Sequence, residues 1–379
     1  RLLQHPRVAL ILSGGGARGI SQIGVLKAFE KHNIPIDLIV GTSMGSIIGG
    51  LYACGYDADD LKRIVDSTDW EETLSLTDEA RRTDLFVDQK ATRERSFLAI
   101  RFDGLQPIIP SSISSGQRLT NMLNRLILQG LYRSTPTFDD LKCSFRVVVT
   151  DLVSGKRVVL GRGDLTEALR ASATVPLVFS PVKKDSMLLM DGGLVSNIPV
   201  DVARQEGMDL VIAVNATSPF RSADQLVAPW ETADQIISIM QQLSNQEQLR
   251  KADVVVAPQL GSHLSSDFTS LDSLINLGEQ AGEEKVAEIR SRLWPSLYAQ
   301  RGSSSALNEN FTVDFKGAPI PDSLKRVILS EHELGIDDRA IERHLAEIYV
   351  LGYYADVYAE VRDDSSGSHI TYVAEYNPT

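Results

Sequence analysis

Two short apolar runs, each followed by glycine and then by a helical pattern, constrain the fold of this chain most strongly. Residues 7–12 and 36–40 are almost continuously apolar, which is typical of strands buried on both faces of a sheet. Apolar side chains at helical spacing predict one helix over 19–33 and a second over 43–54, before Gly55. Strand, helix, strand, helix in this order predicts a parallel sheet with crossover helices.

The same alternation resumes further along the chain. Strands are predicted over 145–151, 157–160, 187–190, 210–214 and 253–257, and helices over 165–171, 199–206, 231–250 and 272–293. We therefore interpret residues 1–300 as one three-layer α/β domain with a mostly parallel central sheet. The Gly- and Ser-rich stretch 301–307 is predicted to be a linker. Residues 308–379 follow the order β-α-α-β-β and are predicted to form a small α+β module.

Composition narrows the partners of the chain. A formal net charge of −12 argues against nucleic acid, because a phosphate backbone requires a basic surface. No run approaches the roughly 18 apolar residues that a membrane-spanning helix needs. The basic segment 81–101 is either a solvated surface loop or a patch that contacts lipid head groups. Cys54 lies in an apolar helical run, which predicts a buried free thiol.

Three motifs point to nucleophilic catalysis. Gly41-Thr42-Ser43-Met44-Gly45 matches G-x-S-x-G between a predicted strand and a predicted helix, a nucleophile elbow in which Gly41 and Gly45 leave room for a tight turn around Ser43. The run from Gly14 to Gly19 offers backbone N–H groups that can hold an oxyanion. Asp191, before Gly192 and Gly193, follows a predicted strand and can approach the serine as its base. Together the motifs predict a serine acyl hydrolase.

The sequence offers two candidates for the base of this hydrolase. Of the six histidines, only His263 comes late enough to complete a Ser-Asp-His order, and its surroundings resemble a plain surface loop. We therefore favour Asp191 acting directly on Ser43 as a Ser-Asp dyad, with both side chains at the carboxyl ends of parallel strands. His263 remains the alternative.

The glycine run also resembles two nucleotide-binding patterns. A dinucleotide site needs an acidic residue at the end of the second strand, but Asp37 lies at the start of that strand. A phosphate loop needs lysine where Ile20 stands. We therefore expect no nucleotide, no other cofactor and no metal. The run is instead predicted to be an oxyanion hole, formed by Gly14, Gly15, Gly16, Arg18 and Gly19. Arg18 would either hold the loop by a salt bridge or contact a substrate phosphate.

At these residues the chain resembles the patatin-like phospholipase family. Its glycine-rich, serine and aspartate motifs correspond to Gly14–Gly19, Gly41–Gly45 and Asp191–Gly193, and its recurrent structural stretches to 150–152, 171–176 and 197–199. The resemblance covers about residues 5–260. It implies a phospholipase A that cleaves acyl esters of glycerophospholipids at a membrane interface through a metal-free Ser-Asp dyad.

The last 70 or so residues are similar to a POTRA module, which has the same order of elements. A patatin-like domain followed by a POTRA module resembles the type V secreted phospholipases of Gram-negative bacteria. This implies an outer-membrane β-barrel in the full-length protein and a secreted or outer-membrane location. The oligomeric state stays open, a homo-oligomer included.

Three alternatives remain open at this stage. The chain could be a broad esterase or thioesterase, or a secretion and assembly module whose hydrolase domain is vestigial. A predicted helix carries an apolar stripe that either packs in the core or forms a lid or acyl-chain wall over Ser43, and the stripe consists of Leu119, Met122, Leu123, Leu126 and Ile127.

Overall fold

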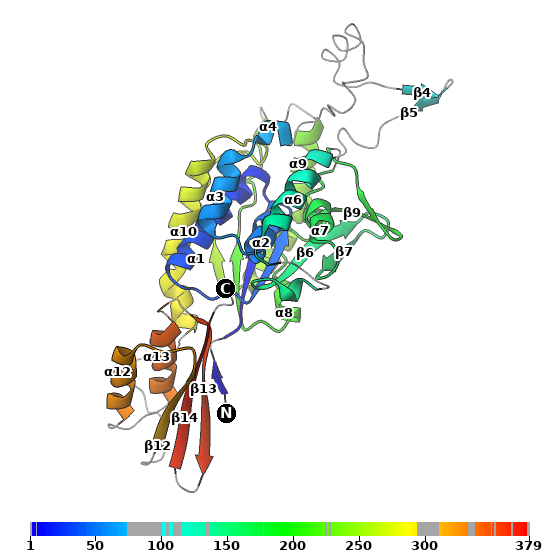
Figure 1. Cartoon of the computed structure of the whole chain (residues 1–379). Helices are drawn as coiled ribbons and strands as arrows, with labels where there is room; N and C mark the ends of the chain where they lie inside the picture. Colours follow the sequence, from blue (N-terminus) through cyan, green and yellow to red (C-terminus); the bar gives the residue numbers. More distant parts are fainter. Residues whose placement is uncertain are drawn as a thin grey trace.

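The structure is a computed structural model of the chain. It describes residues 2–4, 6–73, 101–103, 106–108, 116–132, 137–176, 178–223, 226, 229–293, 311–332, 338–349, 351, 354–364 and 367–376. Figure 1 shows a large α/β domain with a smaller module, residues 311–376, below it. Residues 81–100 of the basic segment and the linker 301–307 lie outside the described residues, so both interpretations stay predictions.

Five parallel strands form the centre of an eight-stranded sheet. They are β2 (Val8–Leu12), β3 (Leu38–Thr42), β6 (Ser144–Asp151), β10 (Leu210–Val214) and β11 (Val254–Val256), in the order β11-β10-β2-β3-β6. Every residue of β2, β3 and β10 is buried, which explains why their sequences are continuous apolar runs. The first two predicted strands are therefore confirmed, the second beginning two residues later than expected.

The rest of the sheet is antiparallel, so the prediction of a mostly parallel sheet holds for its centre and not for this side. β7 (Lys156–Leu160) and β9 (Met187–Asp191) run antiparallel to β6, and β8 (Val182–Lys184) runs antiparallel to β9. The connection from β6 to β7 is only four residues long, and that from β8 to β9 only two. Connections this short can join only antiparallel strands, whereas a parallel pair needs a crossover of a dozen residues or more. The sheet is therefore mixed.

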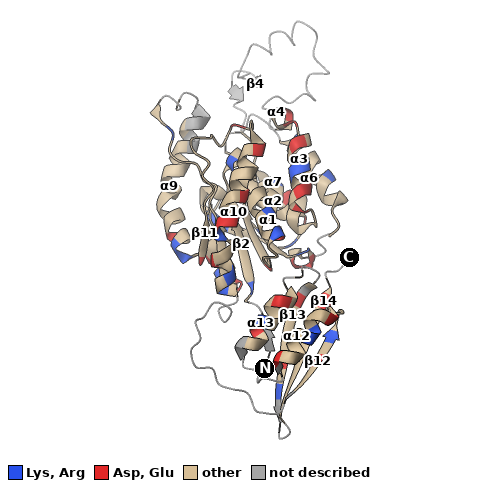
Figure 2. Cartoon of the chain, turned by 90° about the vertical axis from the view of Figure 1, so that its left-hand side faces the viewer, with Lys and Arg blue, Asp and Glu red and all other residues tan. Residues whose placement is uncertain are grey.

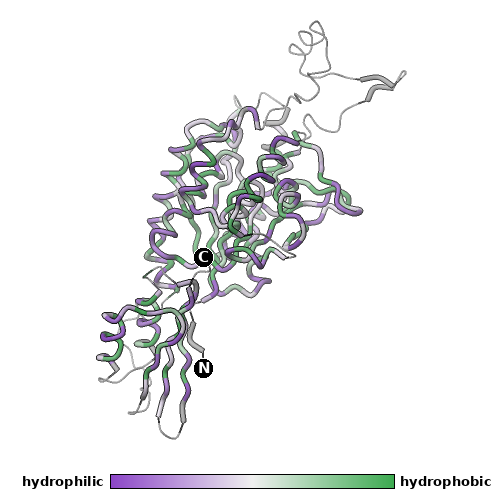
Figure 3. The backbone as a smooth tube through the Cα atoms, viewed as in Figure 1, coloured by the Kyte–Doolittle hydropathy of each residue, from purple (hydrophilic) through white to green (hydrophobic). Residues whose placement is uncertain are grey.

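Helices cover both faces of the sheet, as the three-layer prediction requires. The larger core cluster contains α1 (Ser21–Lys31), α2 (Met44–Ala53), α3 (Ala58–Ser67), α6 (Gln117–Gln129), α7 (Leu165–Ser172) and α10 (Leu271–Leu293). On the opposite face, α8 (Val200–Gln205) packs on β2, β3 and β10 and contacts α9 (Pro229–Lys251). Charged residues recur along these helices and on the small module (Figure 2), and hydropathy alternates along α1 and α10 (Figure 3).

The shorter elements complete the domain. They are α4 (Trp70–Thr73), the hairpin of β4 (Arg101–Asp103) and β5 (Gln106–Ile108), and the 3-10 helices η1 (Gly16–Ile20), η3 (Phe138–Asp140) and η4 (Gly192–Leu194). No helix among the described residues is long and apolar enough to span a membrane.

Helix α6 settles one of the open alternatives. Its leucine stripe is buried, with Leu123 completely inaccessible, and belongs to the larger core cluster beside α7. The stripe is therefore part of the core, and the lid interpretation of these leucines is wrong. Cys54 is also buried and free, as predicted, and burial raises the pKa of its thiol to about 12.

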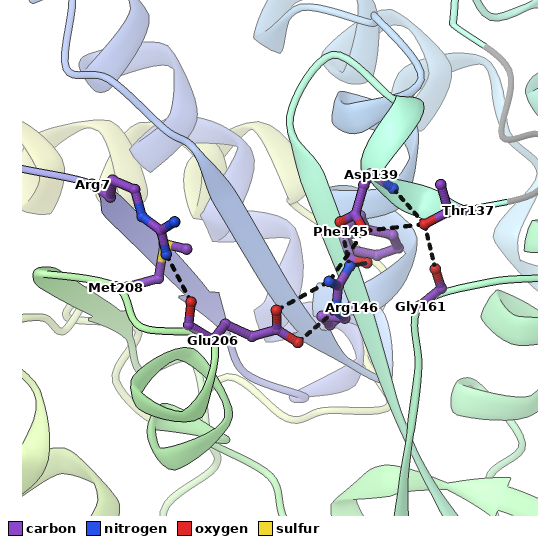
Figure 4. Close-up of polar contacts among 8 residues, drawn as sticks. All are labelled: Arg7, Thr137, Asp139, Phe145, Arg146, Gly161, Glu206 and Met208. Carbon is purple, nitrogen blue, oxygen red and sulfur yellow. Dashed lines mark hydrogen bonds and ion pairs between the residues drawn. The ribbon is translucent and has the colours of Figure 1, made fainter.

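Arg146 links three separate segments on one side of the sheet (Figure 4). From β6 its guanidinium contacts the Asp139 carboxylate at 2.7 Å and the Glu206 carboxylate at 2.8 Å. Glu206 follows α8, and its backbone carbonyl accepts a hydrogen bond from Arg7. The network thus joins η3, β6 and the end of α8, away from the glycine-rich turns.

The small module has the predicted order of elements. It consists of β12 (Phe311–Gly317), α12 (Asp322–His332), α13 (Asp338–Tyr349), β13 (Tyr354–Asp364) and β14 (Gly367–Tyr376). Its sheet has the order β1-β13-β14-β12, in which β1 (Leu2–Gln4) comes from the other end of the sequence and pairs antiparallel with β13. Residues 2–4, grouped with the large domain in the sequence analysis, thus pair within the sheet of the module.

Candidate active site

The register of β6 brings the serine and aspartate motifs together. Residues 147–151 of β6 pair with β7 along one edge. On the other edge, β3 pairs with β6 as far as Thr42, which lies opposite Val148. The next residue of β6, Val149, pairs with Asp191, the last residue of β9. Since β3 and β9 run in opposite directions, their carboxyl ends meet end to end on the same edge of β6. The prediction of two parallel strands is corrected here, because β9 approaches from the opposite direction.

Ser43 and Asp191 are in direct contact at this junction. The Ser43 hydroxyl donates to Oδ2 of Asp191 at 2.6 Å, and the Gly193 N–H donates to Oδ1 at 2.7 Å. The aspartate is 8% exposed. One carboxylate oxygen is thus held by backbone while the other faces the serine, the geometry in which a carboxylate can accept a proton from an attacking hydroxyl.

The turn at Ser43 is strained. Its φ is +53°, in the left-handed region that a non-glycine residue seldom adopts and that costs on the order of 1–3 kcal/mol. A β-carbon at Gly41 would lie 2.5 Å from the Ser46 Cα, and one at Gly45 would lie 2.3 Å from the Leu12 carbonyl oxygen. Both glycines are therefore required by close backbone contacts, and this accounts for the G-x-S-x-G spacing.

Hydrogen bonds on both sides of Ser43 hold this conformation. Its N–H donates to the Ser172 hydroxyl at 2.9 Å, and its carbonyl accepts from the Ser46 hydroxyl at 2.7 Å. The same carbonyl also accepts the backbone N–H groups of Ser46 and Ile47, at the start of α2.

The glycine loop runs directly beside Ser43. A β-carbon at Gly14 would lie 3.0 Å from the Ser43 Cβ, and the Gly14 N–H donates to the Asn197 side-chain oxygen at 3.0 Å. The Ala17 N–H donates to the Ser265 carbonyl. Within the described part of the chain, no acceptor is paired with the N–H groups of Gly15 and Gly16. Two backbone donors of the loop can therefore bind an oxyanion.

Arg18 holds the glycine loop, and within the described ranges it does so without a salt bridge. Its side chain is 5% exposed and donates to the carbonyl oxygens of Gly261 and His263 at 3.0 and 2.8 Å. Burial lowers the pKa of this guanidinium. The contacts are those of a structural residue, so the expectation that a carboxylate would anchor Arg18 is corrected to two backbone carbonyls. Gly19 packs against Met44, where a β-carbon would lie 2.8 Å from that side chain.

His263 lies in the loop that Arg18 binds, but its ring is engaged elsewhere. Its Nε2 lies 2.7 Å from the Asp267 carbonyl oxygen, and its Nδ1 lies 3.9 Å from the Asp267 carboxylate. Among the described residues, no contact joins this ring to Ser43 or Asp191. The geometry favours the dyad over a triad with His263.

Four residues around the dyad had no assigned role in the sequence analysis. Besides Ser172 and Asn197, Thr150 donates its hydroxyl to the Asp191 carbonyl at 3.0 Å, and the Thr174 carbonyl accepts the Asp191 N–H at 3.1 Å. All lie in or beside stretches interpreted as structural. The resemblance marked these stretches, but beyond it the only signal was a small polar residue at the end of an apolar helix or strand, and that pattern is common in any α/β protein.

Among the residues that the structure describes, no group of three or more His, Cys, Asp or Glu side chains could hold a metal ion.

The motifs and their geometry agree with a known protein family. The family model described as patatin-like phospholipase matches residues 10–204, just over half of the chain. The chain belongs to the patatin-like phospholipase family. The match includes the glycine loop, Ser43 and Asp191, and it places this patatin-like domain among lipid hydrolases.

Individual relatives of this patatin-like protein are distant. It is 29% identical over 349 residues to patatin-like phospholipase domain-containing protein 6 of Homo sapiens, and 30% identical over 231 residues to an uncharacterized NTE family protein of Mycobacterium tuberculosis. The alignments cover 84% and 59% of this chain, but only 23% and 54% of those proteins. Among solved structures it is similar to VipD from Legionella pneumophila, with 14% identity and a TM-score of 0.39, over 75% of this chain and 67% of that one.

Proposed function

We propose that this protein is a phospholipase A that hydrolyses acyl esters of glycerophospholipids through the Ser43–Asp191 dyad. The observation that carries the proposal is the 2.6 Å hydrogen bond from the Ser43 hydroxyl to Asp191 at the end-to-end junction of β3 and β9. The strained turn and the two available N–H groups of the glycine loop support it.

The proposed reaction has two steps. Ser43 Oγ attacks the ester carbonyl while Asp191 takes the hydroxyl proton, and the N–H groups of Gly15 and Gly16 bind the oxyanion. Collapse of the intermediate breaks the ester bond, and Asp191 returns the proton to the departing lysolipid alcohol. Asp191 then takes a proton from water, which attacks the acyl-serine. Collapse of this second intermediate breaks the bond to Ser43 Oγ, which takes the proton back from Asp191 as the fatty acid leaves.

Exposed apolar side chains on α9 support a lipid as the source of the ester. Ile236, Ile239, Met240 and Leu243 are each more than half exposed and recur at helical spacing on α9. This helix contacts η4, the turn directly after Asp191. Folded proteins seldom leave such a stripe open to water without a binding role. A purely soluble ester would not account for it.

The small module and the location of the protein are part of the same proposal. The order of elements in residues 311–376 and their single sheet support a POTRA-like module. On that basis we propose a secreted or outer-membrane protein with its own β-barrel in the full-length chain. A protease-protection assay on cells expressing the full-length gene tests this, since a cytosolic product would contradict it.

The dyad is tested by fatty-acid release from phosphatidylglycerol/phosphatidylethanolamine vesicles in the presence of EDTA. Ser43→Ala and Asp191→Asn should each lower kcat by at least about 10³-fold, because each removes a group that acts in the chemical step. Asp185→Asn is the matched control: it changes an exposed aspartate on the β8–β9 turn and should leave activity unchanged. Circular dichroism must show that all variants remain folded.

Each other outcome selects a different alternative. Activity that survives Asp191→Asn would return His263 to consideration as the base. Cleavage of short soluble esters or thioesters without any vesicle hydrolysis would favour a broad esterase or thioesterase. If the parent protein cleaves none of these substrates, the secretion and assembly interpretation gains.

A further inference from the structure

One short segment after α7 contacts the backbone of both members of the dyad. The hydroxyl of Ser172, the last residue of α7, accepts the Ser43 N–H at 2.9 Å. Two residues later, the Thr174 carbonyl accepts the Asp191 N–H at 3.1 Å. Ser172 and Thr174 are both completely buried, so water cannot replace either contact. Residues 172–174 thus fix the nucleophile and its base relative to one another.

The Ser172 hydroxyl is itself oriented by the sheet. It donates to the Val148 carbonyl oxygen at 2.7 Å, and Val148 is the residue opposite Thr42 in the β3–β6 register. The turn after Asp191 packs on the same carbonyl, since a β-carbon at Gly192 would lie 2.2 Å from it. A single buried hydroxyl therefore connects the nucleophile turn to the strand on which both catalytic ends meet.

The conformation of Ser43 makes this contact consequential. A residue at a φ of +53° persists only while the surrounding structure holds it there. The carbonyl side of Ser43 has three donors, but Ser172 is the acceptor for its N–H. Without that acceptor, the peptide before Ser43 can rotate and its Oγ can leave the line to Asp191.

We propose that Ser172 is a positioning residue for the hydrolase reaction: it does not touch substrate but holds Ser43 in the attacking conformation. This rests on the proposed Ser43–Asp191 chemistry. A positioning role differs from a general packing role because it predicts that a substitution at Ser172 slows the chemical step alone. A displacement of about 1 Å in a reacting group can lower the rate on the order of 10²-fold.

The test uses three substitutions at one position in the whole chain. Ser172→Ala removes the hydroxyl, Ser172→Thr keeps it and adds a methyl group, and Ser172→Val has the shape of threonine without the hydroxyl. We expect kcat to fall about 10- to 100-fold for Ala and Val and less than about five-fold for Thr, with KM unchanged. Rates on a short soluble ester are expressed per reactive serine, counted by fluorophosphonate labelling, so that misfolded protein does not count.

Thr166→Ala is the matched control. Thr166 lies on α7, the helix that ends at Ser172, and is also buried, so its substitution likewise removes a hydroxyl from the interior. Its kcat should stay within about two-fold of the parent.

The outcomes separate this inference from the proposed function. If the parent is active and Ser43→Ala is not, but Ser172→Ala keeps the parental kcat per labelled serine, the positioning role is wrong. Equal losses of kcat in Ser172→Thr and Ser172→Val would also overturn the positioning role, because the effect would then be steric. If Ser172→Ala fails to fold, the Thr and Val pair still decides. A parent without esterase activity would defeat the proposed function, and the inference with it.

Discussion

At the scale of single residues, the site depends on positions where no side chain fits. Gly16 combines a φ of +55° with a close contact, since a β-carbon there would lie 2.2 Å from the Ser265 carbonyl oxygen. The Ala17 N–H donates to that same carbonyl, so the loop cannot simply move away. The glycine loop is thus positioned by a backbone contact with a loop more than 200 residues away in sequence.

Gly16→Ala should therefore abolish most activity while leaving the fold intact. The added methyl group pushes the loop away from residue 265, and loss of one oxyanion donor alone typically costs about 10²-fold in kcat. Steady-state hydrolysis of a short ester, with the melting temperature measured in parallel, checks this.

Gly155→Ala is the control for the backbone strain of such a change. Gly155 has a φ of +67°, but nothing lies within 4 Å of the added carbon. It should lose a little stability and no activity. If both variants lose activity equally, the contact with residue 265 is not what matters at Gly16.

At the scale of elements, helix α6 is structural. Its leucine stripe packs in the core beside α7, the helix whose end carries Ser172. Leu123 is fully buried, whereas Leu128 on the same helix is 58% exposed. An amphipathic stripe alone does not distinguish a lid from a core helix, because both have one apolar face.

Leu123→Ala should lower the free energy of unfolding by about 2–5 kcal/mol, the usual cost of a large cavity in a core. Leu128→Ala, the control on the exposed face, should change it by less than about 0.5 kcal/mol. Urea unfolding followed by circular dichroism measures both. A Leu123→Ala protein of parental stability that fails only on vesicles would restore the lid interpretation.

At the scale of the whole molecule, the small module adjoins the end of the sheet opposite to the dyad. Tyr349 at the end of α13 lies near Asp37, and burial together with that carboxylate raises the pKa of its hydroxyl. Asp37 precedes β3 and accepts the Val8 N–H, whereas Ser43 follows β3. At about 3.3 Å per residue, roughly 20 Å of strand separates the module from the nucleophile.

The interior of the module contains a buried histidine. His344 on α13 is fully buried and contacts the Tyr372 hydroxyl on β14 at 2.7 Å and the Glu331 carboxylate on α12 at 3.1 Å. Burial lowers the pKa of this imidazole below its usual 6.5, and the neighbouring Arg343 adds to the effect, although Glu331 opposes it.

The stability of the module should therefore fall with acidification. As the pH falls, His344 takes up a proton in the unfolded chain at about pH 6.5, whereas in the folded state its pKa is lower. Neutral His344 therefore contributes its full stabilisation of the folded state above about pH 6.5. This stabilisation is lost as the pH falls from there toward the folded pKa. Hydrogen exchange of the peptide 338–349, corrected for intrinsic rates, should show less protection at pH 5.5 than at pH 7.5.

His344→Gln should remove most of this pH dependence, while His369→Gln on the partly exposed side of β14 should retain it. Hydrolysis of a short ester, measured at pH 7.5, should be the same in both variants, because the network lies at the far end from Ser43. Equal pH dependence in all three proteins would show that another group is responsible.

The sequence by itself determined most elements and the three motifs, because both depend on local chemistry. Buried parallel strands must be apolar throughout, and a tight turn around Ser43 requires glycine at positions 41 and 45. Only the tertiary structure decided what lies together. Four contacts join residues that are far apart in the chain. They are the end-to-end junction of β9 with β3, the hydrogen bond between Ser172 and Ser43, the bonds from Arg18 to backbone carbonyls, and the pairing of β1 with β13. Such contacts depend on strand register and on which faces meet in the core, and a periodic pattern along the sequence is the same for many arrangements of these elements.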